Sequence, residues 1–178
     1  TVAIIAGSDS ITGRDGEIFL LDVDTGAMLR LTDNEESEWL LTWSHDGRKL
    51  AYFGDKYNSS LTAYLGGLRI LELETMELVQ VEAPPPARDF GQNLAWSPDD
   101  SKLVFTANGL TGAEVYVVNA DGSGVQNLSQ NDGNAFRVTD NYPHWSSDGT
   151  RIYFRSDRAE FAGPHYVVYP DGTGLRPN

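Results

Sequence analysis

Short apolar runs separated by clusters of turn residues recur along the whole chain. Residues 18–21 and 115–118 are continuously apolar, whereas a sheet with one face in water would alternate apolar and polar positions. The clusters between the runs are rich in Asp, Asn, Gly and Pro, as in residues 121–124, and these residue types favour tight turns. The pattern predicts antiparallel strands joined as hairpins, in sheets that bury both faces.

The apolar runs fall into copies of one longer unit. Trp43, Trp96 and Trp145 each open a turn of similar sequence, and they are 53 and 49 residues apart, which is a period typical of propeller blades. A second run aligns in four copies, at residues 21–26, 71–75, 118–122 and 168–172. The first copy is therefore present without its tryptophan.

One copy contains four strands. In the third copy we expect strands at residues 92–97, 102–106, 114–119 and 125–129. Four antiparallel strands joined by hairpins form a propeller blade, whose two faces each contact a neighbouring blade. The sequence thus predicts an all-β protein, a β-propeller of about four blades in a single domain, whose first blade lacks its inner strand. The expected blades are residues 1–33, 39–82, 91–130 and 140–178.

The recurring turn residues are expected to be structural. Trp43, Trp96 and Trp145 would fill the space between blades, with each indole N–H needing one acceptor. The aspartates of the same turns would tighten them through hydrogen bonds to nearby amides; these residues are Asp46, Asp99 and Asp148. None of the turns carries the full D-x-D-x-D-G series of a calcium loop.

These motifs resemble the TolB-type β-propeller repeat, which runs W-S-P-D-G, S-D-R, I-Y-V-x-N-A-D-G-S-G and a closing L-T. Residues 96–99 with 115–124, and residues 143–149 with 156–158, carry the match. Asp100 replaces the turn glycine of the third copy, and Arg176-Pro177 stands where the last copy should close. The resemblance implies one of three roles, because such repeats occur in periplasmic scaffolds similar to TolB, in gates of serine peptidases and in polysaccharide lyases.

Composition narrows the functional classes. A net charge of −13 and a sequence pI near 4.4 argue against a general nucleic-acid binder, because phosphate recognition needs clustered Lys and Arg. No apolar stretch is long enough to span a membrane. Cysteine is absent, which excludes disulfides but discriminates poorly between compartments. We expect a periplasmic or secreted protein, with a cytoplasmic one as the alternative.

Catalytic signatures are missing from the sequence. A serine hydrolase needs a G-x-S-x-G elbow and an α/β domain behind it, and neither is found. The candidate metal cluster is His144 and His165 with Asp140 or Asp157; the simpler interpretation is that His144 occupies a variable position before a tryptophan. The prediction is a non-enzymatic protein without metal or cofactor.

Partner-binding candidates fall in two regions. The densest mixed-charge group surrounds the last tryptophan turn, where arginine is the residue type most enriched at binding hot spots. Two longer connections, at residues 54–67 and 81–90, add aromatic residues at loop positions. The candidates are Arg137, Asp140, Asn141, His144, Arg155, Asp157, Arg158, Tyr57 and Tyr64. We expect a protein or peptide partner, with plain solvation and surface salt bridges as the alternative.

The sequence does not determine how the propeller closes into a ring. A propeller must close, because a bare end blade exposes an apolar face and a strand edge. Three arrangements satisfy this condition: part of a larger propeller, a self-closed ring of four blades, or a homodimer that completes an eight-bladed ring. The missing first inner strand favours a larger propeller, completed either by more sequence or by a second copy.

Overall fold

The computed structural model describes residues 1–7, 16–58, 63–81, 89–109, 112–130, 138–158 and 165–178. In these residues the chain is all-β, with strands arranged as one three-stranded and three four-stranded antiparallel sheets. Each sheet is a meander in chain order, because each strand pairs with the one before it and the one after it. The predicted β-propeller fold with about four blades is confirmed, including the first blade without its inner strand.

The four sheets are named blades 1 to 4. Blade 1 consists of β1 (Val2–Gly7), β2 (Gly16–Leu21) and β3 (Met28–Arg30). Blade 2 consists of β4 (Ser37–Trp43), β5 (Lys49–Asn58), β6 (Ala63–Glu72) and β7 (Leu78–Val81). Blade 3 consists of β8 (Asp89–Trp96), β9 (Lys102–Asn108), β10 (Ala113–Asn119) and β11 (Gln126–Asn127). Blade 4 consists of β12 (Asp140–Trp145), β13 (Ile152–Ser156), β14 (His165–Val168) and β15 (Arg176–Pro177).

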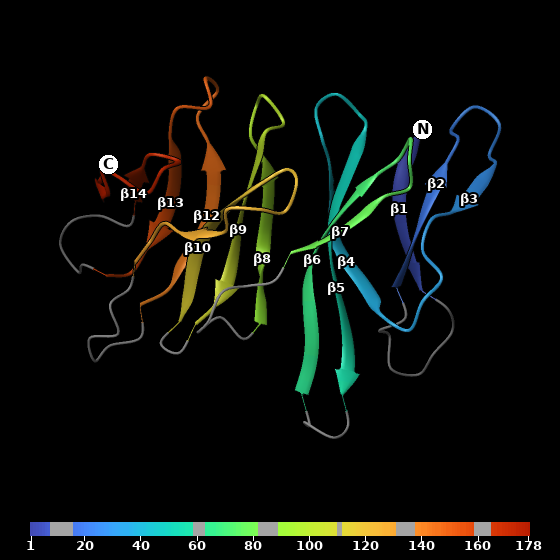
Figure 1. The fold of residues 1–178 in the computed structure, drawn as a ribbon, viewed down its shortest axis with the longest axis horizontal. Helices are drawn as coiled ribbons and strands as arrows, with labels where there is room; N and C mark the ends of the chain where they lie inside the picture. The colour runs from blue at the N-terminus through green and yellow to red at the C-terminus, as the bar shows by residue number, and fades with distance from the viewer. Residues whose placement is uncertain (8–15, 59–62, 82–88, 110–111, 131–137, 159–164) are drawn as a thin grey trace.

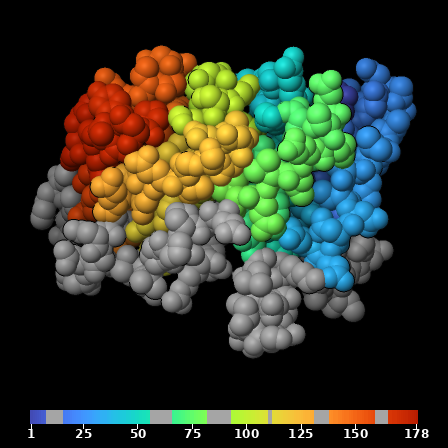
Figure 2. Space-filling model, viewed as in Figure 1, coloured from blue at the N-terminus to red at the C-terminus, as the bar shows by residue number. Residues whose placement is uncertain are grey.

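The blades stand side by side in a row, with the N-terminus at blade 1 and the C-terminus at blade 4 (Figure 1). Neighbouring blades are in direct contact in the space-filling view, as successive coloured bands (Figure 2). Blades 1 and 4 lie at opposite ends of the row, so the described residues do not form the self-closed ring of four blades.

The core is divided among the blade junctions. Between blades 2 and 3, Phe53 and Leu68 meet Leu103, Phe105 and their neighbours, all at most 4% exposed. Ile18 meets Leu50 between blades 1 and 2, and Val115 meets Phe154 between blades 3 and 4. Both faces of an inner blade are therefore buried, which explains the continuously apolar strands of the sequence.

A β-bulge interrupts β4, β8 and β12, and in β4 and β12 its one extra residue reverses the inside–outside alternation of the strand. In β12 the register shifts between Asn141 and His144, where Tyr142 has a φ of 57°. As a result Asp140 and Trp145 lie on the face toward blade 3, although five positions apart, while Asn141 and His144 lie on the opposite face. The same shift occurs in β4 around Leu40, whose φ is 52°.

The outermost strands are shorter than the pattern predicts. β11 covers Gln126–Asn127 in place of residues 125–129, because Leu128 turns inward, fully buried, and donates its N–H to the Val115 carbonyl at 2.8 Å. In blade 4 the unusual Arg176-Pro177 pair still forms a two-residue outer strand. Conversely, β8 begins at Asp89 and so extends the predicted inner strand by three residues.

Candidate functional site

Each tryptophan turn is tightened by a serine and an aspartate. The Ser44 hydroxyl donates to Asp46 at 2.7 Å, and the equivalent Ser97–Asp99 and Ser146–Asp148 bonds are 2.6 Å. The same hydroxyls accept the backbone N–H groups five residues later, at 2.9–3.0 Å. Hydrogen bonds donated to the carboxylates, first of all by the serine hydroxyls, lower the pKa of Asp99 and of Asp148 to about 2.

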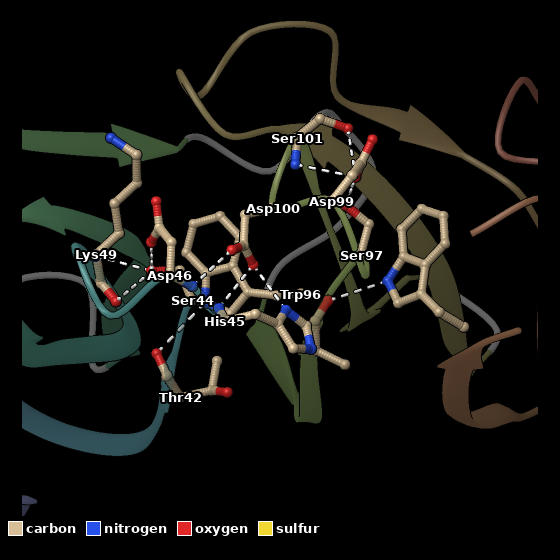
Figure 3. A network of polar contacts seen from close by, with 12 residues as sticks. Thr42, Ser44, His45, Asp46, Lys49, Trp96, Ser97, Asp99, Asp100 and Ser101 are labelled. Atoms are coloured by element: carbon tan, nitrogen blue, oxygen red, sulfur yellow. Dashed lines mark hydrogen bonds and ion pairs between the residues drawn. The ribbon is translucent and has the colours of Figure 1, made fainter. Parts of the chain in front are cut away.

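The tryptophans themselves link successive blades. Trp96 of blade 3 donates its indole N–H to the Thr42 carbonyl of blade 2 at 3.4 Å, as Figure 3 shows. Trp145 of blade 4 donates in the same way to the Ala95 carbonyl of blade 3 at 3.2 Å. In both cases the acceptor is the residue that precedes the tryptophan of the previous blade. Each of these two indoles thus donates to the blade before its own, so both hydrogen bonds run in the same direction along the chain.

Asp100 adds a second link between blades 2 and 3. Its carboxylate accepts the backbone N–H groups of His45 at 2.8 Å and of Asp46 at 2.9 Å, and it contacts His45 Nδ1 at 2.7 Å (Figure 3). Burial opposes its ionisation, but these hydrogen bonds outweigh burial and lower the pKa of Asp100. The sequence marks this residue only as a departure from the repeat, at a turn position where blades 2 and 4 have glycine.

A buried ion pair holds blade 4 against blade 3. Asp140 is fully buried and accepts from Arg158 Nη2 at 2.8 Å, while the same nitrogen donates to the Ser129 carbonyl of blade 3 at 3.0 Å. The guanidinium also lies 5.0 Å from the centre of the Tyr166 ring. Two of the predicted partner-binding residues, Asp140 and Arg158, are therefore part of the blade junction, and Asp140 has no surface to offer a partner.

The junction of blades 1 and 2 has a carboxylate at the equivalent place but a different partner set. Glu38 is 2% exposed and accepts hydrogen bonds from the Thr32 hydroxyl at 3.0 Å and from Asn34 Nδ2 at 2.8 Å. Burial raises its pKa, the two hydrogen bonds oppose that shift, and the nearby charges of Glu17 and Glu36 add to it. The printed partners of Glu38 are thus neutral, whereas Asp140 pairs with the arginine Arg158.

The free face of blade 4 is basic and aromatic. Cross-strand pairing places side chains of β12, β13, β14 and β15 together on the face that points away from blade 3. These residues are Asn141, His144, Tyr153, Arg155, His165, Val167 and Arg176. The His144 and Tyr153 rings stack 5.5 Å apart. Among these residues none is acidic, although the chain as a whole has a net charge of −13.

The other predicted partner-binding residues, apart from Asp140 and Arg158, separate into three groups. Asn141, His144 and Arg155 lie on this free face, and the structure adds Tyr153, His165 and Arg176 to them. Asp157 is exposed and accepts the Thr139 N–H at 2.6 Å. Tyr57 and Tyr64 are opposite each other in the β5–β6 hairpin, but their side chains, like the whole of Arg137, lie outside the described part of the structure.

The candidate metal cluster does not assemble. His144 and His165 share the free face of blade 4, whereas Asp140 is on the opposite face, buried against blade 3. Within the described ranges, no group of three or more His, Asp or Glu side chains is placed to hold a metal ion. The same ranges contain no helix long and apolar enough to cross a membrane.

Comparisons with known structures agree with this geometry. TolB from Acinetobacter baumannii superposes with a TM-score of 0.66 at 16% identity, covering 98% of this chain and 40% of that protein. The chain has a TolB-like β-propeller fold. A manganese complex of oligogalacturonate lyase gives a TM-score of 0.67 at 17% identity, with 98% of this chain and 49% of the lyase covered. No protein-family model matches the sequence.

A peptidase structure shares the same TolB-like fold. Dipeptidyl peptidase 4 from Porphyromonas gingivalis has a TM-score of 0.66 at 12% identity over 98% of this chain and 30% of its own length. The chain thus spans less than half the length of each of these three proteins. Structures that share the TolB-like fold therefore include enzymes as well as TolB, and the fold by itself assigns no activity.

Proposed function

We propose that this chain is a non-enzymatic, TolB-like propeller scaffold that binds a protein or peptide partner in the cell envelope or outside the cell. The observation that carries the proposal is the composition of the free face of blade 4. The faces that blades 1, 2 and 3 turn toward the next blade are apolar, with Ile18, Phe53 and Val104 among their buried residues.

The corresponding face of blade 4 is polar. It carries Arg155, His165 and Arg176, all exposed, beside the His144–Tyr153 ring stack. Polar and charged side chains on the face of a sheet favour contact with water or with a partner. Exposed arginine and aromatic side chains are also the residue types most enriched at protein interfaces. Because this face is basic on an acidic chain, the partner surface is acidic.

A capture experiment with matched variants tests the proposal. The immobilised chain is exposed to cross-linked envelope extract, and captured proteins are identified by mass spectrometry. We expect one acidic protein to be enriched by the wild type and lost with the double variant Arg155→Glu/Arg176→Glu. The control is Arg48→Glu in the blade 2 turn, whose side chain is 73% exposed, and it should capture the same protein. Equal capture by both variants would contradict a role of this face.

The competing candidate is the propeller domain of an enzyme, favoured by the likeness to a lyase and a peptidase. In that case the chain would gate or support a catalytic site. Calorimetric titration with Mn²⁺, Zn²⁺ and Ca²⁺ addresses the lyase candidate, because a metal-dependent site would bind one of them at sub-millimolar concentration. An α/β-hydrolase domain following this segment in the intact gene would favour the peptidase candidate.

A further inference from the structure

A groove opens between blades 2 and 3 near their outer strands, and we name it the outer groove. It lies between the β6–β7 turn of blade 2 and the β10–β11 turn of blade 3. Its volume of about 580 Å³ is within the range of roughly 300 to 1,000 Å³ that is typical of ligand pockets. Both blades are four-stranded sheets, so the groove belongs to a complete junction.

The outer groove has an apolar base and an acidic rim. Ile70, Val79 and Ala120 form the base and pack in the core between blades 2 and 3. The β10–β11 turn is held close to this base, because a Cβ added at Gly122 would clash with the Val79 side chain. The rim carries two cations and four carboxylates, a formal charge of −2; these residues are Arg48, Lys49, Glu72, Glu74, Glu77 and Asp121.

The charges of the rim are not balanced locally. Both cations already have acidic partners, one of them the rim residue Glu72. The other three rim carboxylates, of Glu74, Glu77 and Asp121, are exposed. Over the described ranges none of these three takes part in an ion pair. The groove therefore holds negative charge that a cation of a partner would complement.

The corresponding groove between blades 3 and 4 shows that the fold does not require this charge. It has a volume of about 690 Å³ and is lined by one lysine and one acid, Lys102 and Asp171, so its formal charge is zero. Lys102 stands opposite Asn119, whereas the equivalent lysine of blade 2 stands opposite Glu72. The acidic rim is thus specific to one junction and is not needed to pack two blades.

An exposed methionine stands in the turn that forms one wall of the outer groove. Met76 lies between the lining residues Thr75 and Glu77 and is 52% exposed. Its φ is 57°, and the equivalent position of blade 1 is Gly26 with a φ of 72°. Glycine is the residue that this conformation favours, so the fold alone does not explain a methionine here. Methionine is an adaptable apolar residue that is common on binding surfaces.

From these observations we infer that the outer groove docks a basic segment of a partner protein. An arginine of the segment lies with its aliphatic stem on Val79 and Ala120, and its guanidinium lies among the three unpaired carboxylates. Arginine fits better than lysine, because its planar guanidinium is more weakly hydrated and can donate to two carboxylates at once. Apolar residues beside the arginine contact Met76.

This site is separate from the free face of blade 4 and extends the proposed function. The blade 4 face is basic and suits an acidic surface, whereas the outer groove is acidic and suits a basic segment. Neither site includes a residue of the other. Each can therefore be removed by substitution while the other is kept.

Binding of a defined peptide tests the inference. The probe is fluorescein-labelled Gly-Leu-Arg-Leu-Arg-Leu-Gly, and the protein is the chain of 178 residues. We expect saturable binding by fluorescence anisotropy that weakens as salt is added, because salt screens exposed charges. The amide resonances of Thr75, Glu77 and Asp121 should shift on binding. The same peptide with glutamine in place of both arginines should bind at least tenfold more weakly.

Matched charge variants locate the site. Glu74→Gln/Glu77→Gln should lower the affinity about tenfold, as expected when a hydrogen bond between charged groups is lost. Asp24→Asn/Asp33→Asn is the control, because it removes the same number of charges from exposed positions of blade 1. This control should bind within about twofold of the wild type. The comparison separates docking in the groove from general attraction between a basic peptide and an acidic chain.

A third variant tests the apolar base without changing any charge. Ala120→Leu introduces the residue that blade 2 has at the equivalent position, Leu73. The backbone N–H groups of Ala120 and Leu73 donate to the equivalent carbonyls of Ser101 and Arg48, at 2.9 Å in both blades, so the repeat accommodates leucine here. The larger side chain fills the base of the groove, and affinity should fall about fivefold while the salt dependence stays the same.

Four outcomes would overturn the inference. They are absence of saturable binding, equal loss in the two double variants, equal binding of the glutamine peptide, and self-association in sedimentation velocity that Glu74→Gln/Glu77→Gln abolishes. The last result would make the occupant a second copy of the chain. Capture of an acidic protein through the blade 4 face, without peptide binding, would leave the proposed function standing and remove the docking site. Peptide binding without that capture would do the reverse.

Discussion

Asp100 and His45 join two blades from opposite sides of one junction. The Asp100 carboxylate reaches 2.8 Å from the His45 backbone N–H and 2.7 Å from its ring Nδ1. Asp100 itself has a φ of 56°, in the left-handed region where the equivalent Gly47 and Gly149 have 71° and 70°. The side chain therefore offsets a backbone conformation that favours glycine.

Replacing Asp100 by Asn should destabilise the fold by about 1 kcal/mol, because the amide keeps the size and the turn conformation but weakens bonds that a charged acceptor strengthens. The free energy of unfolding in urea measures the loss. Asp24→Asn, in the exposed turn of blade 1, is the control and should leave stability unchanged. A loss of equal size in both variants would contradict the link between blades.

Acid should weaken the tryptophan turns. Asp99 and Asp148 have pKa values of about 2 in the fold against 3.8 for the free side chain. A carboxylate with a lowered pKa stabilises the fold fully above about pH 4, and this contribution disappears as the pH falls toward 2. Urea midpoints measured from pH 5 to pH 2 should drop in that window. The double variant Asp99→Asn/Asp148→Asn should show a shallower drop, and an unchanged profile would exclude these residues as its cause.

Replacing Glu38 by Gln should stabilise the fold at neutral pH. Burial raises the pKa of Glu38, so its ionisation at neutral pH costs stability, and the cost fades as the pH falls and the group takes up a proton. An uncharged glutamine can still accept from Thr32 and Asn34. We expect a higher free energy of unfolding in urea at pH 7 and a smaller gain at pH 4. A destabilised variant at pH 7 would show that the charge of Glu38 is needed.

The Arg158–Asp140 pair should show strong coupling. Arg158→Met leaves a buried carboxylate without its cation, and we expect a loss of about 3 kcal/mol. Adding Asp140→Asn should recover part of that loss, so that the double-mutant cycle gives a coupling energy of about 1 kcal/mol or more. Additive effects of the two substitutions would mean that the ion pair contributes nothing to the junction of blades 3 and 4.

The sequence predicts the fold well because the spacing of its tryptophans and its apolar strands both result from blades that pack face to face. Both faces of a blade are buried, so apolar residues run without alternation, and each copy needs one indole at the same junction. The missing inner strand of blade 1 is equally visible, because one tryptophan is absent from four otherwise aligned copies. These features depend on residue type and spacing alone.

The composition of the candidate site was less predictable because of the β-bulges. Asp140, Asn141 and His144 stand close together in the sequence and look alike as polar candidates. The bulge at Tyr142 changes the phase of β12, so that Asp140 turns into the junction while Asn141 and His144 stay on the free face. A phase change of this kind depends on backbone conformation and leaves no clear signal in the residue types.

Asp100 illustrates a different limit. The sequence shows it only as a replacement for the turn glycine of the repeat, and its partners lie 54 and 55 positions away in the sequence. At the following junction the same clamp is not possible, because Gly149 has no side chain and Pro98 has no N–H to donate. A contact used at a single junction cannot be recognised from a repeat pattern.

The direction of the indole hydrogen bonds has an evolutionary consequence. Blades 3 and 4 each carry an indole donor for the blade before them, blades 2 and 3 each carry the acceptor for the blade after them, and the acceptor is a main-chain carbonyl that any residue provides. For this hydrogen bond, a duplicated blade would therefore fit between two existing blades without compensating substitutions. Gain or loss of whole blades by unequal recombination is accordingly easier for this architecture than a change within a single junction.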